Sequence, residues 1–477
     1  MESQNRGGFA TNFGFLMAAI GSAVGLGNLW GFPYKMGANG GFAFLLVYLI
    51  LAIFVGLAVM LGEMALGRKT GQGCVGAYAA MGKKFKWVGV CGVVAGFFIL
   101  CFYMVLGGIV LRYVCGYLLA MFGSNNFGDP ATFFGRFITN GGSMLIWFFV
   151  FTLLNVLVIA GGVAEGIEKF NKIAMPALFF LLLIVLIYVA CQPGAGEGYK
   201  FMFSWNVKPL QEDFLKVVKT AAGQMFFSLS LGMSVMITYG SYLSKKEDLE
   251  KDALIVVVSD TLIAIMAGMV ILPACAAFGL EYGAGPGLLF STMQVVFASM
   301  GGFIGNFIGF LFYLLVFLAA MSSSISVLEG VTAYFVDKNL KEGKGGETGG
   351  RKKACIIAAV VIFVVGSLVA LDGLGGGIEG GALINSPAQM LGIEAQGWSD
   401  CWLDFFDMLS EGILMPLGSM MLAIFIGYVW KTDTIMDECE ASGHKAWGHG
   451  FFKFCYKITT PIGMLIVLYG QITSFFG

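Results

Sequence analysis

Charged residues are scarce in this chain, and their scarcity argues against most classes of soluble protein. Only 12% of the 477 residues are Asp, Glu, Lys or Arg, about half the share that soluble domains carry. In contrast, 58% are hydrophobic and the mean hydropathy is +0.84. The net charge is −1 and no basic stripe occurs, so nucleic-acid binding is not expected.

Histidine and paired cysteine are also rare. The two histidines, His444 and His449, lie in a glycine-rich stretch where ordinary solvated side chains are expected. The ten cysteines are scattered without a CxxC pair, which argues against a metal or disulfide framework. No intramembrane histidine accompanies an acid or nucleophile, so we expect that the protein is not an enzyme.

Long apolar runs are abundant, and they predict an all-α polytopic membrane protein. The segment 280–302 is also apolar, but its glycines and proline favour a re-entrant outer loop. We expect eleven transmembrane helices, near 12–36, 41–68, 87–122, 142–162, 167–191, 216–243, 250–281, 303–336, 354–372, 400–430 and 454–475.

Lys and Arg predict the orientation of these helices in the membrane. Most of the 28 basic residues fall in alternate connecting segments, such as 83–86, 337–353 and 431–457. The positive-inside rule places these segments and the N-terminus in the cytoplasm, and an odd number of helices places the C-terminus outside.

Two expected helices contain residues that interrupt a helix. The first holds "GSAVGLGNLWGFPY" (21–34) and the sixth holds "GQMFFSLSLG" (223–232). The freed backbone groups cost several kcal/mol each in lipid unless they line a cavity or meet a ligand. A GxxxG match at 21–25 alone would favour close helix packing. Breaks in corresponding positions of two halves instead favour an inverted-repeat secondary transporter.

Polar residues within other apolar runs add three weaker signals. Ser322 to Ser324 in "LAAMSSSISVLEG" suit a weakly held Na+ or simple packing. Asp260 lies mid-span in "VVVSDTLIAIMAG", where an acid is a functional candidate. Glu63 in "LGEMALGR" lies nearer a helix end, and a structural role is as good an interpretation as a functional one.

These features together resemble the neurotransmitter:sodium symporters, on the bacterial side of that family. The motifs "GSAVGLGNLWGFPY", "ANGGFAFLLVY", "GEMALGR", "GQMFFSLSLG" and "ITYGSY" occur in order and at family spacing. The resemblance covers nearly all of 1–477 as a single domain. It implies the fold named for the bacterial leucine transporter (LeuT-like), a 5+5 inverted repeat with broken helices 1 and 6. The repeats would be 12–191 and 216–430, and 454–475 would be an additional helix.

The resemblance implies two sodium sites and a substrate site. The first sodium site would use Ala23, Asn28, Ser228 and Asp260. The second would use Gly21, Val24, Ala319, Ser322 and Ser323. The substrate carboxylate would meet the amides of Leu26 and Gly27 and the Tyr103 hydroxyl, and its ammonium would meet Ala23, Phe227 and Ser228, with Ser230 nearby. Its side chain would lie among Ile99, Phe227, Met233, Ser323 and Val327.

The chain departs from the animal members at two of these positions. The family's amine carriers have an aspartate where this chain has Gly25, so we expect an amino acid substrate with its own carboxylate. The animal members bind chloride near the residues that match Tyr48, Gln224 and Ser228. Here Asp260 stands where they have an asparagine, and a one-residue gap would shift that match to Ser259. Its charge would replace that of chloride, so we expect transport that does not require chloride.

The gates give a third departure. Gly31 replaces an arginine that closes the outer gate in the family, and Asp404 and Asp407 match the acidic side of that gate. We hypothesise that Lys35 supplies the missing cation, although a lysine that snorkels to the interface is an equal alternative. At the inner gate, Arg6, Asp337 and Tyr242 match family residues.

The sequence therefore predicts Na+-coupled import of a small hydrophobic or aromatic amino acid by alternating access. The alternatives are a carrier of another zwitterion, such as a betaine or an omega-amino acid, and a sensor that binds without transporting. We expect a bacterial plasma-membrane protein whose partners are its substrate and the bilayer, with no nucleic acid and no obligate protein partner.

Overall fold

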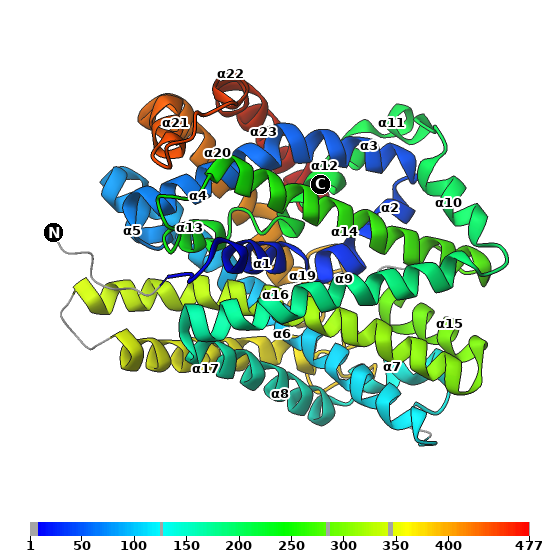
Figure 1. The fold of residues 1–477 in the computed structure, drawn as a ribbon. Coiled ribbons are helices and arrows are strands. Elements are labelled where there is room, and N and C mark those ends of the chain that lie inside the picture. Colours follow the sequence, from blue (N-terminus) through cyan, green and yellow to red (C-terminus); the bar gives the residue numbers. More distant parts are fainter. Residues whose placement is uncertain (1–7, 125–126, 283–286, 342–346, 477) are drawn as a thin grey trace.

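The protein is built of helices that run side by side through its apolar middle (Figure 1). The computed structural model describes residues 8–124, 127–282, 287–341 and 347–476, and these residues contain no strand. The α-helices are α1 Asn12–Ala23, α2 Phe32–Ala38, α3 Phe42–Leu51, α4 Leu57–Thr70, α5 Cys74–Met81, α6 Lys86–Met121, α7 Pro130–Ile138, α8 Gly141–Ala160, α9 Lys169–Ala190, α10 Ala195–Phe203, α11 Lys208–Glu212, α12 Phe214–Ser228, α13 Val235–Gly240, α14 Leu249–Ala277, α15 Met293–Met300, α16 Gly302–Lys341, α17 Glu347–Leu371, α18 Pro387–Leu391, α19 Trp402–Asp407, α20 Met415–Ile424, α21 Thr432–Glu440, α22 His449–Phe454 and α23 Thr460–Phe476.

Most of the expected transmembrane helices are present. In the described part of the chain, nine helices are long and apolar enough to cross a membrane. A tenth candidate is the first expected span, which consists of two helices, Asn12–Ala23 and Gly27–Ala38, bent by 45°. The sixth expected span is divided into α12 and α13, neither of which is long enough alone. The polytopic all-α prediction is confirmed, and the total of eleven spans stays a prediction.

The first break follows from a close approach of three chain segments. α1 ends at Ala23, and Val24 is extended with φ −77° and ψ 97°. A Cβ atom on Gly25 would lie 2.5 Å from the Ser323 hydroxyl oxygen and 2.6 Å from the Tyr103 hydroxyl oxygen. Only glycine fits between these two side chains. The helix therefore opens where its backbone meets hydroxyl groups.

The second break lies between α12 and α13 and contains unusual backbone angles. Ser230, Gly232 and Ser234 have φ of 54°, 74° and 71°. Such angles are unfavourable for serine and are found where the surroundings hold them in place. Here the Gly232 amide donates to Glu63 Oε1 at 2.8 Å, and Ser230 Oγ donates to the Ser22 carbonyl at 2.8 Å. Both breaks thus have buried polar partners.

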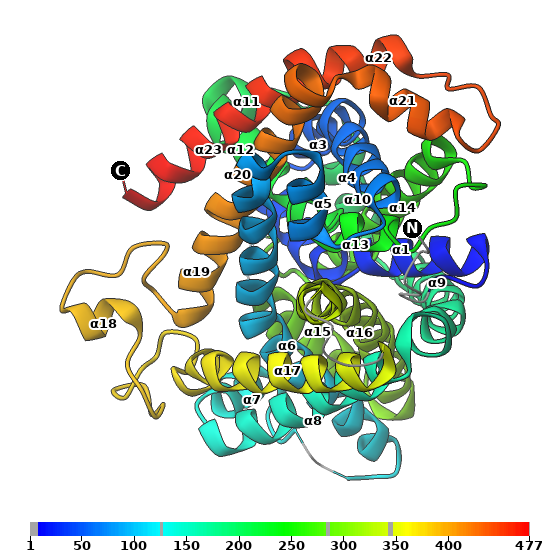
Figure 2. The same ribbon diagram turned by 90° about the vertical axis from the view of Figure 1, so that its left-hand side faces the viewer.

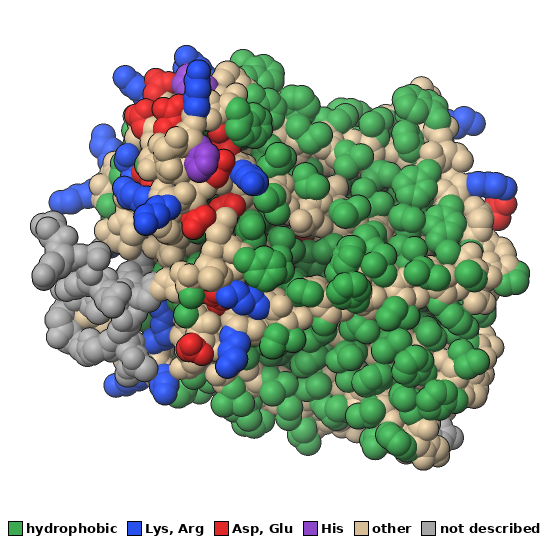
Figure 3. Space-filling view, viewed as in Figure 1, with side chains coloured by type: hydrophobic (Ala, Val, Ile, Leu, Met, Phe, Trp, Pro, Cys, Tyr) green, Lys and Arg blue, Asp and Glu red, His purple; other side chains and the backbone are tan. Residues whose placement is uncertain are grey.

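The broken helices lie in the interior of the bundle. α1 packs against α9, α14 and α16, and α13 packs against α4 and α16. Figures 1 and 2 both show α1 next to α9 and α14. Figure 3 shows apolar side chains over most of one face, with most of the charged residues at one end, around α21 and α22. We call the end of the molecule that holds Lys69, Lys245 and Glu438, together with α21 and α22, the Lys-rich end.

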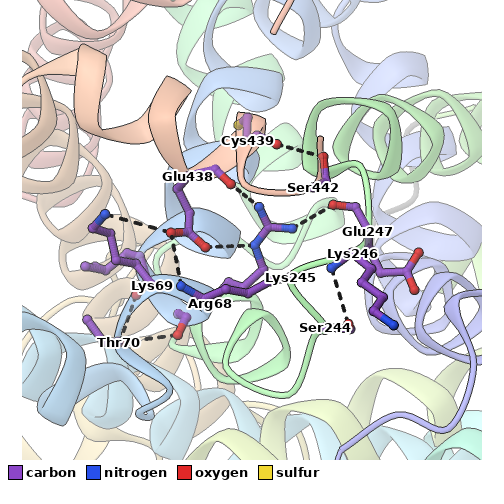
Figure 4. A network of polar contacts seen from close by, with 12 residues as sticks. Arg68, Lys69, Thr70, Ser244, Lys245, Lys246, Glu247, Glu438, Cys439 and Ser442 are labelled. Atoms are coloured by element: carbon purple, nitrogen blue, oxygen red, sulfur yellow. Dashed lines mark hydrogen bonds and ion pairs between the residues drawn. The ribbon is translucent and has the colours of Figure 1, made fainter. Parts of the chain in front are cut away.

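An ion cluster joins α21 to the rest of the Lys-rich end (Figure 4). Arg68, at the end of α4, contacts Glu438 Oε1 at 3.0 Å and also the Glu438 carbonyl, and it donates to the Glu247 carbonyl at 2.7 Å. Lys69 and Lys245 lie 3.9 Å from the same carboxylate. Arg68 and Glu438 are buried, so the pair fastens α21 to α4.

Candidate functional site

A buried carboxylate lies beside both broken helices. Asp260 of α14 is fully buried and accepts hydrogen bonds from Asn28 Nδ2 at 2.7 Å and from Ser228 Oγ at 3.0 Å. Tyr48 Oη donates to it at 3.3 Å. These donors are neutral, so none of them balances the charge of a carboxylate, which is costly to bury uncompensated. The Asp260 carboxylate and the two hydroxyl groups offer oxygen atoms of the type that hard cations bind.

The structure brings together the residues predicted for the first sodium site. Asn28, Ser228 and Asp260 form one hydrogen-bonded cluster, and Ala23 ends α1 two residues before Gly25. Asn28 Oδ1 also accepts from the Gly25 amide at 3.0 Å. The side chain of Asn28 therefore ties the opened backbone of the first break to Asp260. The described residues contain no group of three His, Cys, Asp or Glu side chains that would suit a transition metal.

A second oxygen cluster joins the end of α1 to α16. Ser323 Oγ lies 3.2 Å from the Gly21 carbonyl oxygen, 3.0 Å from that of Ser22 and 3.3 Å from that of Val24. Ser322 Oγ donates to the Ala319 carbonyl at 3.0 Å. All five residues predicted for the second sodium site thus lie on these two facing segments.

Asn171 of α9 belongs to the same region and was missed from the sequence. A Cβ atom on Gly21 would lie 2.3 Å from Asn171 Oδ1 and 3.1 Å from the Ser322 Cβ atom. This Asn171 oxygen is buried without a hydrogen-bond partner. Oxygen ligands are what Na+ requires, and Asn171 adds one more candidate. The only signal in the sequence is that Asn171 is a polar residue between Lys169 and Lys172. This pattern is equally typical of a helix end.

A small cavity lies between the two clusters. Its volume is about 20 Å³, room for about one water molecule and much less than an amino acid needs. The Tyr103 and Phe227 rings face each other across it with centroids 6.3 Å apart. Its lining contains ten of the predicted substrate residues together with Ser22, which was missed: Ser22, Ala23, Gly25, Gly27, Ile99, Tyr103, Phe227, Ser230, Met233, Ser323 and Val327.

The other two predicted substrate residues lie directly behind this lining. The Leu26 amide donates to Tyr103 Oη at 3.0 Å, and Ser228 is bonded to Asp260. Gln224 Nε2 donates to the Gly27 carbonyl at 2.7 Å. The cavity is therefore lined by non-helical backbone, hydroxyl groups and apolar side chains. This lining suits a ligand with a polar head and an apolar side chain.

On the side of the cavity away from the Lys-rich end, the structure corrects one hypothesis. Lys35 Nζ contacts Glu411 Oε1 at 2.9 Å, not Asp404 or Asp407. Asp407 lies close enough to interact electrostatically with both members of this pair, whereas Asp404 contacts Cys401 at 3.1 Å. Glu411 was missed because it lies one turn beyond Asp407, in a π-helical segment, Met408–Leu414.

Gly31 lies against the side chain of Gln224. A Cβ atom on Gly31 would lie 2.7 Å from Gln224 Oε1, so a larger residue there would require this side chain to shift. Lys35 lies one turn further along the helix.

Two of the three predicted inner-gate residues, Asp337 and Tyr242, lie at the Lys-rich end. Arg6 falls outside the described residues. Asp337 Oδ2 accepts from the Gly73 amide at 2.8 Å, and Tyr242 Oη donates to Glu329 Oε1 at 2.6 Å. Arg351 contacts the same Glu329 oxygen at 2.5 Å. This buried pair joins α16 to α17. It was missed because its two residues belong to different helices, on either side of the segment 342–346.

Comparisons with known proteins identify the family of this chain. The model of the "Sodium:neurotransmitter symporter family" matches residues 6–125 and 134–476. The sodium-dependent transporter YhdH of Bacillus subtilis is 32% identical over 98% of both chains. The sodium-dependent neutral amino acid transporter B(0)AT3 of Mus musculus is 30% identical over 54% of this chain and 46% of its own.

A solved structure is similar over nearly the whole chain. It is the crystal structure of MhsT in complex with L-phenylalanine, 37% identical, with a TM-score of 0.85 over 98% of this chain and 99% of that one. The LeuT-like fold class predicted from the sequence is therefore confirmed. The chain belongs to the sodium:neurotransmitter symporter family and is a sodium-dependent membrane transporter, not an enzyme.

Proposed function

We propose that this protein imports a hydrophobic or aromatic amino acid together with Na+, without a requirement for chloride. The observation that carries the proposal is the neutral hydrogen-bonding environment of buried Asp260 beside a cavity lined by opened backbone. The protein would act in a bacterial plasma membrane with its N-terminus in the cytoplasm. Its helices 12–191 and 216–430 would form the two inverted repeats, with 454–475 as an additional helix.

The two oxygen clusters are the proposed sodium sites. Ala23, Asn28, Ser228 and Asp260 would hold one ion, which also meets the substrate carboxylate. Gly21, Val24, Ala319, Ser322 and Ser323 would hold the other. A carboxylate between a cation and the amides of an interrupted helix is neutralised from both sides. Removal of the substrate would therefore weaken the first site, which couples the two binding events.

The cavity is the proposed substrate site. The amides of Leu26 and Gly27 and the hydroxyl of Tyr103 would take the carboxylate. The carbonyls of Ala23, Phe227 and Ser228 would take the ammonium group, with Ser230 nearby. Ile99, Met233 and Val327 would surround the side chain, and Gly25 leaves room for the backbone of the substrate. The L-phenylalanine of the MhsT complex supports an aromatic amino acid, as does the apolar wall.

The small size of the cavity implies movement during transport. A volume of about 20 Å³ cannot admit an amino acid, so Phe227 and Tyr103 must move apart when substrate enters. The Lys35–Glu411 pair would close the site on the outer side. Arg6, Asp337 and Tyr242 would close it on the inner side, with the Glu329–Arg351 pair beside Tyr242. Alternate opening of these two layers is the proposed transport cycle.

Uptake into proteoliposomes tests the proposal. Labelled phenylalanine, leucine, tryptophan, glycine betaine and an omega-amino acid are supplied with and without an inward Na+ gradient, in chloride and in gluconate. We expect accumulation of an apolar amino acid that needs Na+ and is equal in the two anions. Uptake of betaine alone would favour the other-zwitterion alternative. Binding of phenylalanine without uptake would favour the sensor.

A further inference from the structure

An apolar groove near the Lys-rich end belongs to neither the substrate cavity nor the gates. It lies between α6, α16 and α17 and has a volume of about 260 Å³. Val90, Val94 and Phe97 form one wall, and Phe335 and Val361 form the others. Val90, Phe335 and Val361 are exposed. The groove thus opens onto the apolar surface, where lipid surrounds the protein.

A second hollow adjoins the groove at its charged end. It has a volume of about 630 Å³, and Val75 and Tyr334 line both spaces. Lys83, Lys86 and Lys338 line the second hollow, and all three are exposed. Its lining contains one acid, Asp337, whose carboxylate accepts a hydrogen bond from the Gly73 amide at 2.8 Å. The three ammonium groups outnumber it, so the hollow attracts anions.

The two hollows together extend over about one leaflet of a membrane. α6 rises about 16 Å from Lys86 to Phe97 at 1.5 Å per residue, and half of the hydrocarbon core is about 15 Å thick. α16 and α17 follow the same order, because Lys338 comes just after Phe335 and Lys353 comes just before Ile357. α6 and α16 therefore both present a lysine at the polar end of the groove.

We propose that the two hollows together bind one anionic phospholipid, with its phosphate among Lys83, Lys86 and Lys338 and an acyl chain along the groove. Basic pockets between transmembrane helices favour such lipids, since each nearby lysine adds to the attraction. A peptide in the groove would instead leave backbone groups without partners against apolar walls. This inference depends on the protein lying in a membrane and is independent of the proposed substrate.

Native mass spectrometry of the purified, delipidated full chain tests the site. The protein is titrated with phosphatidylglycerol or with phosphatidylcholine that has the same acyl chains. We expect one molecule of phosphatidylglycerol to bind more tightly than phosphatidylcholine. The triple variant Lys83→Gln, Lys86→Gln, Lys338→Gln should lose roughly ten- to a hundredfold in affinity for phosphatidylglycerol. The matched control Lys251→Gln, Lys445→Gln, Lys453→Gln removes the same charge at the same end and should keep it.

A groove variant and a soluble head group separate a lipid from a free anion. Val94→Trp fills the groove and leaves the lysines, so it should weaken phosphatidylglycerol binding as well. Glycerol phosphate, which has no acyl chain, should not displace the lipid at equal concentration. The proposal is overturned by equal binding of the two lipids, by unchanged binding in the lysine variant, or by displacement with glycerol phosphate. Thermal melting of each variant checks that it is folded.

Discussion

The Lys35 ammonium group lies 2.9 Å from the Glu411 carboxylate, and both side chains are largely buried above the substrate cavity. Lys35 follows the first break, and Glu411 lies in the π-helical segment of the tenth expected span. The pair therefore joins one of the two broken helices to a helix of the second half. An ion pair in this place can bias the equilibrium between open and closed forms on the outer side.

We expect Lys35→Met to lower uptake by about five- to thirtyfold. The substitution leaves the largely buried Glu411 carboxylate without its cation, which should cost about 1–2 kcal/mol. Glu411→Gln should act similarly. The charge exchange Lys35→Glu with Glu411→Lys should restore part of the activity lost in each single variant. Initial rates of Na+-driven uptake measure all three.

Asp404→Asn is the matched control, since Asp404 contacts Cys401 and not Lys35. It should leave uptake within about twofold. If the exchange variant stays as inactive as the single variants, while Asp404→Asn is equally damaging, the gate role of the Lys35–Glu411 pair is wrong.

Asp260→Asn should lower the apparent Na+ affinity by at least about tenfold and make uptake respond to chloride. The Asp260 carboxylate supplies a negative charge to the site. When that carboxylate is removed, an added anion must supply the charge. The parent protein should work equally in chloride and gluconate. Uptake as a function of Na+ concentration in each anion measures the effect.

Asp252→Asn controls for the loss of a buried acid on the same helix. Asp252 bonds Asn12, away from the cavity, so this variant should keep the Na+ affinity and stay insensitive to chloride. A parent protein that requires chloride would refute the proposed role of Asp260.

The Arg68–Glu438 pair offers a stability prediction that is separate from transport. Glu438→Gln leaves the buried Arg68 guanidinium without its counterion, which should cost about 3 kcal/mol of folding stability. Lys69→Gln and Lys245→Gln remove contacts of 3.9 Å from more exposed lysines, and each should cost less than about 1 kcal/mol. Thermal melting of the detergent-solubilised protein ranks the three. Equal losses would show that Arg68 does not carry the attachment of α21.

Much of the fold was predictable because its signals are local. The expected span 142–162 corresponds to Gly141–Ala160, and 87–122 corresponds to Lys86–Met121. Both breaks fall where glycine, proline and serine interrupt an apolar run. Such residues change the conformation of the backbone turn in which they lie. Their effect can therefore be predicted from the sequence without knowledge of any distant contact.

Partners that are distant along the chain were not predictable in the same way. Glu411 was passed over in favour of Asp407, because a π-helical turn changes which residue faces Lys35. The Glu329–Arg351 pair and the position of Asn171 next to Gly21 depend on how separate helices pack. The cluster around Asp260 was anticipated only through the family resemblance, since nothing local links residues 28, 228 and 260.

Asp372, in the loop that follows α17, should make stability depend on pH. Its carboxylate is buried and accepts from the amides of Trp402 at 2.7 Å and Leu374 at 3.0 Å. Burial raises the pKa of Asp372 to about 6, against about 3.9 in an unfolded chain. The folded protein thus binds this proton more tightly. Its contribution, up to about 3 kcal/mol, is fully present below about pH 4 and is lost as the pH rises through 6.

Thermal melting at pH 4 and pH 8 measures this contribution. Asp372→Asn should lose less stability than the parent between the two pH values, because its amide does not titrate. Asp400→Asn, at an exposed position between α18 and α19, should behave like the parent. Identical pH dependence in all three proteins would mean that Asp372 is not responsible.

Gly25 should decide the class of substrate. The parent protein should take up phenylalanine or tryptophan and not tryptamine, because no residue replaces the carboxylate that an amine lacks. Gly25→Ala should abolish uptake, since its Cβ atom would lie within 2.6 Å of the hydroxyl oxygens of Ser323 and Tyr103. Gly135→Ala, the same change where nothing lies within 4 Å, should leave uptake unchanged. Competition assays with paired amino acids and amines measure the selectivity. Equal inhibition by tryptamine and tryptophan would contradict an amino acid substrate, because it would show that binding does not depend on the carboxylate.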